Sequence, residues 1–318
     1  MSAIDARAHL PRRAGQPGRG DANLGRWFGR SAGRFFDGGS LDEMVAEMDD
    51  AGVDRAVLVT APGRDPSEGR GQGRLATTAG YSDVAFRELC TEIAESVSAF
   101  PDRFTGMAML DPMGGMAAVR QVERAKHEFG FAGCAVMPAL IGRPASDPCY
   151  LSICAKCEEL ELPLTINVGI PGPMRPGSVQ SPQHLETLAL SFPDLTLIGT
   201  HVGHPWHEQM VDLLTRFDNV YLMTSAWAPK YLPASLVEFL DGPGVGKVMW
   251  ATDYPLLPFD RCLAEITDLD LGQAAEEALL WRTALDLFWP EDAPQLDRRG
   301  CKAAAPRDAA IEGAGELN

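Results

Sequence analysis

The feature that most constrains the fold of this 318-residue chain is a repeated alternation of short apolar runs with amphipathic segments. Eight runs read as strands: 3–10, 55–60, 104–110, 133–138, 162–169, 195–203, 220–225 and 247–255. The segments between them include 41–52, 86–100 and 116–130, which have helical spacing of apolar residues. Strands that alternate with helices pair in parallel. Eight of them over about 250 residues predict a closed (β/α)8 (TIM) barrel, an α/β fold, with a doubly wound open sheet as the alternative.

The same pattern predicts one barrel domain over residues 1–290. Two segments, 11–39 and 61–80, break the alternation and are rich in Gly, Arg, Ser and Pro. Each follows a predicted strand, so each is expected at the C-terminal face of the barrel, as a substrate-covering loop or as an insertion without a role. Residues 291–318 lack periodicity and are expected to form a flexible tail.

Charge and cysteine content limit the binding partners and the cellular compartment that the chain is expected to have. The net charge of −16 and the pI of about 4.8 disfavour contact with nucleic acid or with an anionic membrane. No apolar run approaches the ~20 residues of a membrane helix, and the N-terminus has no apolar signal core. The seven cysteines form an odd, scattered set. They are interpreted as reduced thiols, so we expect a cytoplasmic protein.

Function in a barrel is read from the C-terminal ends of the strands, where active sites lie. Along the first predicted strand, Asp5, Arg7 and His9 alternate and are predicted to share one face. Further polar residues end three other predicted strands: Asn167, His201 and Asp253. We therefore predict one polar constellation at a common barrel mouth.

Residues near these strand ends are candidate substrate contacts: Arg175, His204, Trp206, Trp227 and Tyr254. Pro205 is predicted to be the first residue of the next helix, because proline suits that position. His204 would then lie at the helix N-terminus and face the barrel mouth. The aromatic residues would line a pocket or, in the alternative, pack beneath the loops.

The stretch SFPDLTLIGTHVGHPW (191–206), followed by NVYLMTS (219–225) and ATDYP (251–255), resembles the amidohydrolase-related family. That family includes aminocarboxymuconate-semialdehyde decarboxylase, resorcylate decarboxylases and pyrone dicarboxylate lactonase. The likeness is strong over 162–288 and weaker but collinear over 1–160. The resemblance implies a TIM-barrel hydrolase or decarboxylase that acts on a small carboxylated substrate, aromatic or lactone-like, and it leaves a homodimer open.

The resemblance also implies a metal site, which this chain matches only in part. Decarboxylases of the family hold a divalent metal with H-x-H on strand 1, a His after strand 5 and an Asp after strand 8. His9 and Asp253 stand at such ligand positions, whereas Arg7 and Asn167 replace the other two ligands. Catalytic zinc usually takes three protein ligands. We therefore expect no cofactor, with a divalent metal such as zinc at His9 and Asp253 as the alternative.

Two interpretations of Arg7 follow. In the first, its guanidinium replaces the positive charge of the metal and grips a substrate carboxylate, while His201, Asp253 and His9 supply acid–base catalysis. In the second, Arg7 forms an inward salt bridge to Asp5 or Asp253. A dry pocket with Arg7 bonded to Asp253 would favour a non-catalytic barrel, either a pseudoenzyme or a small-molecule binding protein. Hydrolysis and decarboxylation both remain open.

Overall fold

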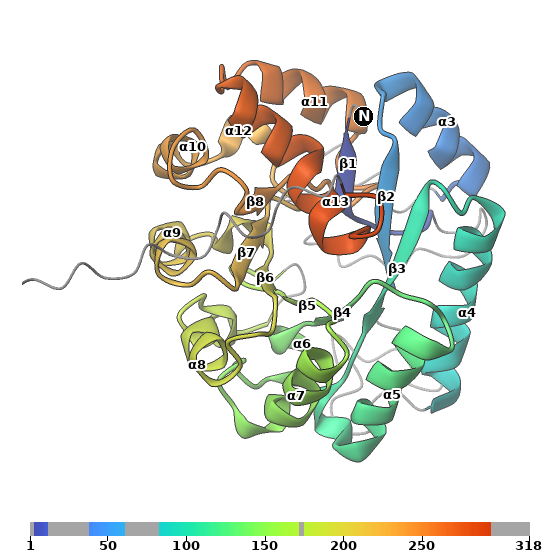
Figure 1. Cartoon of the computed structure of the whole chain (residues 1–318). Helices are drawn as coiled ribbons and strands as arrows, with labels where there is room; N and C mark the ends of the chain where they lie inside the picture. The colour runs from blue at the N-terminus through green and yellow to red at the C-terminus, as the bar shows by residue number, and fades with distance from the viewer. Residues whose placement is uncertain (1–2, 12–37, 61–82, 172–174, 294–318) are drawn as a thin grey trace, which may run out of the picture.

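The computed structural model describes residues 3–11, 38–60, 83–171 and 175–293. Within them, eight parallel strands form one sheet in the order β1 to β8. The strands are β1 (Ile4–Ala8), β2 (Arg55–Val59), β3 (Phe104–Met109), β4 (Gly133–Val136), β5 (Leu164–Ile166), β6 (Leu197–Gly199), β7 (Val220–Met223) and β8 (Val248–Met249). Each predicted run contains one of them. The predicted TIM barrel is confirmed (Figure 1).

Main-chain contacts between β1 and the residues after β8 close the sheet. Ala8 pairs in parallel with Tyr254. The Ala6 amide donates to the Trp250 carbonyl at 3.1 Å, and the Asp253 amide donates to the Arg7 carbonyl at 2.9 Å. This closure excludes the open-sheet alternative. It also brings Arg7 beside Asp253, although 246 positions separate them in the sequence.

Helices surround the strands (Figure 1). Their bounds are α3 (Leu41–Ala51), α4 (Asp83–Ala99), α5 (Met116–His127), α6 (Pro138–Ile141), α7 (Leu151–Glu159), α8 (His184–Ser191), α9 (His207–Arg216), α10 (Ala234–Leu240), α11 (Phe259–Thr267), α12 (Gln273–Glu277) and α13 (Thr283–Phe288). The first three match the predicted helices. α3 shows the local cause: a capping box between Ser40 and Glu43 begins it, and Gly52 at φ 79° ends it.

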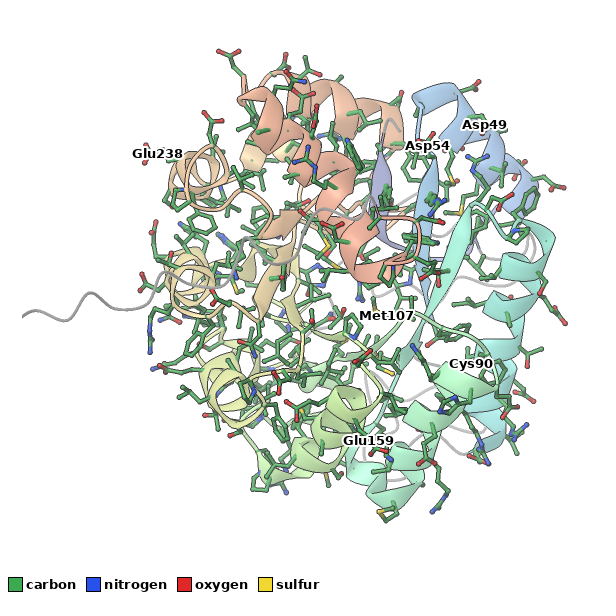
Figure 2. All side chains as sticks on the ribbon, in the orientation of Figure 1. Asp49, Asp54, Cys90, Met107, Glu159 and Glu238 are labelled. Carbon is green, nitrogen blue, oxygen red and sulfur yellow. The ribbon has the colours of Figure 1, made fainter. Side chains whose placement is uncertain are left out.

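The side chains of the strands divide into two layers. Inward-facing residues of the strands pack with α13, and the inner cluster includes Ile4, Ala6, Val57, Val59, Met107, Met109, Ala135, Ile198, Met223, Met249 and Ala251. The opposite faces pack under the surrounding helices. Figure 2 shows Met107 near the centre of the barrel, the buried Cys90 on α4, and the exposed Glu159 and Glu238 at the periphery.

The prediction that Asp5 shares a face with Arg7 and His9 is wrong. Ile4 and Ala6 belong to the inner cluster, so Asp5 between them faces the outer layer. The pairing of β1 with β2 then shifts register between Asp5 and Ala8. Such an irregularity inserts one residue and reverses the alternation. Beyond it, Ala8 joins the outer cluster, and Arg7 points toward the barrel mouth.

The prediction that Pro205 begins a helix is also wrong, because α9 begins at His207. The preceding residues form a tight turn in which the Trp206 amide donates to the Gly203 carbonyl at 2.8 Å. The Ile170 amide of the neighbouring loop donates to the His204 carbonyl, also at 2.8 Å. These contacts hold the chain out of helical conformation for two further residues.

Three predictions concern residues outside the described part of the chain. Most of the loops at 11–39 and 61–80, and nearly all of the tail at 291–318, fall there. Among the residues that are described, none of the helices has both the length and the apolarity to cross a bilayer.

Candidate functional site

Polar residues from four strand ends meet in a chain of contacts at the C-terminal face of the barrel. Nε of Arg7 donates to Oδ1 of Asp253 at 2.7 Å. Oδ2 of Asp253 lies 3.6 Å from Nδ1 of His201. Nε2 of His201 lies 3.1 Å from Nδ2 of Asn167. His9 joins this group with Nε2 at 3.7 Å from Oδ1 of Asp253. The sheet therefore brings all five predicted residues together.

The ion pair of Arg7 and Asp253 is buried, with exposed fractions of 1% and 8%. Burial alone would raise the pKa of Asp253, but Arg7, His201 and His9 together outweigh it and lower the pKa. Asp253 is therefore an ionised carboxylate at neutral pH. Nη1 of Arg7 is buried and has no hydrogen-bond partner among the described residues. The guanidinium thus keeps one donor for a group that enters the site.

The two histidines beside this pair are neutral at neutral pH. Burial lowers the pKa of His9 to about 4, with Asp253 opposing the shift and Arg7 adding to it. Burial also lowers the pKa of His201, again against the pull of Asp253 and with help from Arg7. A neutral imidazole can accept a proton from a substrate.

Ser225, two residues after β7, is a part of the site that sequence reasoning missed. Its carbonyl oxygen lies 3.0 Å from Nδ1 of His201, and its hydroxyl accepts from the His201 amide at 3.3 Å. The only sequence signal was a Thr-Ser pair at a predicted strand end. Every residue carries a main-chain carbonyl, so no residue type in the sequence marks this contact.

Backbone strain concentrates at the same strand ends. Four non-glycine residues there have positive φ: His201 at 54°, Val202 at 61°, Ala226 at 61° and Asp253 at 54°. Such conformations cost on the order of 1–3 kcal/mol each and cluster at functional sites. Their position supports this face as the functional one.

Asp5 supports the site from the outer layer. Its carboxylate accepts from the main-chain amides of Arg7 and Thr252, each at 3.0 Å, and from the Thr252 hydroxyl. Burial raises the pKa of Asp5 to about 7, although these hydrogen bonds oppose the shift. Asp5 therefore ties β1 to the segment after β8 directly behind the Arg7–Asp253 pair.

The predicted substrate contacts around the rim divide into two sets. His204 is half-buried, and its ring lies 4.6 Å from that of Trp227. Arg175 lies in the loop after β5, and its Nη2 is buried without a partner in the described part of the chain. Trp206 is half-buried in the loop after β6. Tyr254 instead belongs to the outer layer, where its ring stacks on Phe259 at 4.6 Å. It follows the inward Asp253, so alternation turns it away from the mouth.

These residues do not fit a resident divalent metal. Among the residues described, no three His, Cys, Asp or Glu side chains are arranged to hold an ion. The Asp253 carboxylate already accepts from Arg7, whose permanent charge would repel a dication. Both nitrogens of His201 are occupied, one by the Ser225 carbonyl and one by Asn167.

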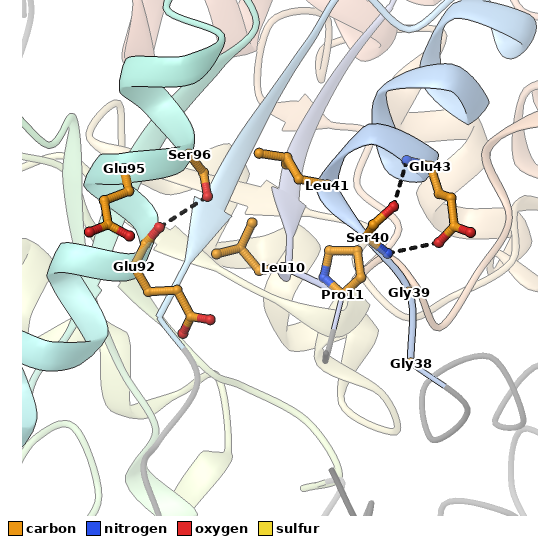
Figure 3. Close-up of a pocket in the computed structure, with 10 residues that line it drawn as sticks. All are labelled: Leu10, Pro11, Gly38, Gly39, Ser40, Leu41, Glu43, Glu92, Glu95 and Ser96. Atoms are coloured by element: carbon orange, nitrogen blue, oxygen red, sulfur yellow. Dashed lines mark hydrogen bonds between the residues drawn. The ribbon is translucent and has the colours of Figure 1, made fainter. Parts of the chain in front are cut away.

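A cavity of about 680 Å³ lies between α3, α4 and the residues that follow β1 (Figure 3). It is lined by Leu10, Pro11, Gly38, Gly39, Ser40, Leu41, Glu43, Glu92, Glu95 and Ser96. None of the candidate site residues lines it. At its edge, Pro11 and Gly38 border the segment 12–37, which is outside the described residues. We therefore assign no ligand to this cavity.

The fold and the site together define a TIM-barrel protein with a cluster of polar residues at its strand ends. The chain belongs to the amidohydrolase family, whose model matches residues 4–288. This membership confirms the family that the sequence resemblance predicted. A search of the curated proteins finds no match.

Solved structures with the same fold cover nearly the whole barrel. An uncharacterised TIM-barrel protein from Bordetella bronchiseptica has a TM-score of 0.69 at 20% identity, over 90% of this chain and 98% of that one. The 5-carboxyvanillate decarboxylase from Sphingomonas paucimobilis has a TM-score of 0.63 at 18% identity, over 90% and 99%. A dihydroxybenzoic acid decarboxylase from Polaromonas sp. JS666, with bound manganese and the inhibitor 2-nitroresorcinol, has a TM-score of 0.67 at 19% identity, over 92% and 98%. At these identities the likeness establishes the fold alone.

Proposed function

We propose that this chain is a metal-independent hydrolase or decarboxylase of a small carboxylated substrate, aromatic or lactone-like. Arg7 anchors the substrate anion, and His201, Asp253 and His9 carry the acid–base chemistry. The observation that supports this most directly is a neutral His201 beside the ionised Asp253 carboxylate, with the unpartnered Nη1 of Arg7 in the same site. Structural neighbours that are decarboxylases of aromatic carboxylates support the substrate class.

The anchoring role rests on the unpartnered Nη1 of Arg7. A buried donor without an acceptor costs about 1–3 kcal/mol, and a substrate carboxylate would remove that cost through a charge-assisted hydrogen bond. Nε would remain on Asp253, so anchoring does not require the ion pair to break. Nη2 of Arg175 is also buried and has no partner among the described residues, so Arg175 is proposed as a further contact to the substrate anion. Asn167, His204, Trp206 and Trp227 are proposed to complete the binding surface.

The acid–base role is assigned first to His201. Its lowered pKa leaves it neutral and able to take a proton, and Asp253 at 3.6 Å would stabilise the imidazolium that forms. Asp253 is itself a weak base because Arg7 holds its pKa down. Neutral His9, on the other side of Asp253, is proposed to assist proton transfer. Hydrolysis and decarboxylation both use a held anion and a proton carrier.

A second candidate is a barrel that binds a small molecule without transforming it. The salt bridge between Arg7 and Asp253 favours it, because that pairing is what an unused site would adopt. Family membership and the strained backbone at His201 and Asp253 favour the catalytic proposal instead.

The test is a substrate screen on the purified chain with and without a chelator. A panel of hydroxylated benzoates, other aromatic carboxylates and carboxylated lactones would be followed by carbon dioxide release and by loss of ring absorbance. We expect turnover of at least one compound, unchanged by chelation and lost in His201→Ala but retained in His127→Ala, an exposed histidine on α5. Turnover that persists in folded His201→Ala, or that requires added metal, would contradict the proposal. Binding without turnover across the panel would favour the second candidate.

A further inference from the structure

The environment of the His201 ring fixes which of its nitrogens carries hydrogen. Nδ1 lies 3.0 Å from the carbonyl oxygen of Ser225. A carbonyl oxygen accepts hydrogen bonds and cannot donate one. Nδ1 must therefore be the donor, and the Ser225 hydroxyl at 3.1 Å can share the same hydrogen. In a neutral imidazole the other nitrogen, Nε2, then has a lone pair.

Asn167 faces that lone pair with its amide nitrogen, 3.1 Å from Nε2. This orientation is the one that a neutral Nδ1–H ring demands, since an amide oxygen in the same place would oppose a second lone pair. The Asn167 side chain is 2% exposed, and its Oδ1 has no partner among the described residues. Among the described residues, the contact with Nε2 of His201 is thus the one side-chain hydrogen bond that Asn167 makes.

From these contacts we propose that Asn167 is a positioning residue that, with the Ser225 carbonyl, holds His201 as the Nδ1–H tautomer and makes Nε2 the proton-accepting atom. A carboxylate at position 167 would present only acceptors and draw a hydrogen onto Nε2, which would remove the base. An amide donates to the lone pair without adding charge. The acidic proton of a substrate replaces the Asn167 donor at the same lone pair. The catalytic meaning of Nε2 rests on the proposed function, whereas the tautomer does not.

The tautomer can be read directly from long-range proton–nitrogen correlation spectra of the ¹⁵N-histidine-labelled chain at pH 7. The chain has six histidines, so His201→Gln identifies the His201 signals by their loss. We expect a protonated-type signal for Nδ1 and an unprotonated-type signal for Nε2, the reverse of the tautomer that free histidine favours. Asn167→Ala keeps the Ser225 carbonyl but loses the donor to Nε2. In this variant the Nε2 signal should move toward that of a free lone pair, and the share of the ring protonated at Nε2 should rise above that of wild type.

Two further variants make the test decisive. Asn167→Asp should convert Nε2 to a protonated-type signal at the same pH, an effect that a purely structural role would not produce. Ser225→Ala is the matched control, because it removes the hydroxyl and keeps the carbonyl, so the Nδ1–H tautomer should remain. A wild-type ring protonated at Nε2, or a folded Asn167→Asp variant with an unprotonated Nε2, would overturn the inference. These spectra need no substrate, so a failed substrate screen with the expected spectra would reject the proposed function alone.

Discussion

Replacing Arg7 by methionine tests the electrostatics of the site most severely. Methionine keeps much of the length of the side chain and removes the guanidinium. Asp253, only 8% exposed, would then lose the guanidinium that balances its charge and whose Nε donates to its Oδ1 at 2.7 Å. Breaking a buried ion pair by removing one partner costs roughly 3–5 kcal/mol. A domain has a total stability of about 5–15 kcal/mol, so the loss should be easily measured.

A double-mutant cycle separates the pair from the loss of packing. Asp253→Asn in the Arg7→Met background removes the orphaned charge, so the double variant should be more stable than the sum of the single losses by about 2–3 kcal/mol. Arg216→Met provides the control, because Arg216 contacts Glu186 at 2.6 Å but is 55% exposed. An exposed pair of that kind contributes about 0–1 kcal/mol.

The dependence on pH adds a second, independent criterion. In the wild type, Asp253 has a lowered pKa, so its stabilisation is present above the unfolded value near ~3.9 and is lost as the pH falls through the folded pKa. In Arg7→Met, burial is unopposed by the guanidinium and the folded pKa rises above the unfolded value. In this variant, the contribution of Asp253 to the free energy of unfolding is most favourable at low pH and is lost as the pH rises. The deficit of Arg7→Met relative to wild type should therefore grow between pH 5 and pH 8.

The assay is urea unfolding followed by circular dichroism at both pH values. A deficit below about 1 kcal/mol at pH 8, equal to that of Arg216→Met and the same at pH 5, would refute the view that Arg7 neutralises a buried Asp253.

Three further predictions concern metal content, rate and pH. Elemental analysis of the purified chain should find far less than one zinc or manganese per molecule. A stoichiometric metal whose removal abolishes activity would show that a cation can bind despite the Arg7–Asp253 ion pair. On the true substrate, folded His201→Ala and Asp253→Asn should each lose about 10²–10⁴-fold in kcat. Arg7→Met, assayed under conditions where it is folded, should chiefly raise KM. Near wild-type rates in the first two variants would place the chemistry elsewhere. The pKa of Asp5 is raised to about 7, so its contribution to stability is greatest at low pH and is lost as the pH rises through that value. Wild type should therefore lose stability relative to Asp5→Asn between pH 5 and pH 8. A difference in unfolding free energy that stays constant over this range would mean that Asp5 does not titrate in it.

Much of the site could be predicted because barrel strands place their C-terminal ends at one face. Asn167, His201 and Asp253 each follow a recognisable apolar run, and this alone predicted that they converge. Asp5 was predicted on the wrong face of the first strand, and the position of Tyr254, in a pocket or beneath the loops, was left open. Both follow from a related cause. Alternation assigns faces only while register holds, and the irregularity in β1 is set by pairing with β2. The start of α9 was misplaced because contacts with the loop after β5 outweigh the local preference of Pro205.

Hydrophobic periodicity along the chain was enough to predict the eight strands, their parallel order and the residue types at their ends, because periodicity is a local property. Which polar atoms pair depends instead on the tertiary structure. Closure of the sheet brought Arg7 to Asp253, and the meeting of β5, β6 and β7 brought Asn167 and the Ser225 carbonyl to the two nitrogens of His201. Hydrogen bonds depend on distances of a few tenths of an ångström and on direction. Those quantities arise from the packing of the whole barrel and are not encoded in any short segment of it.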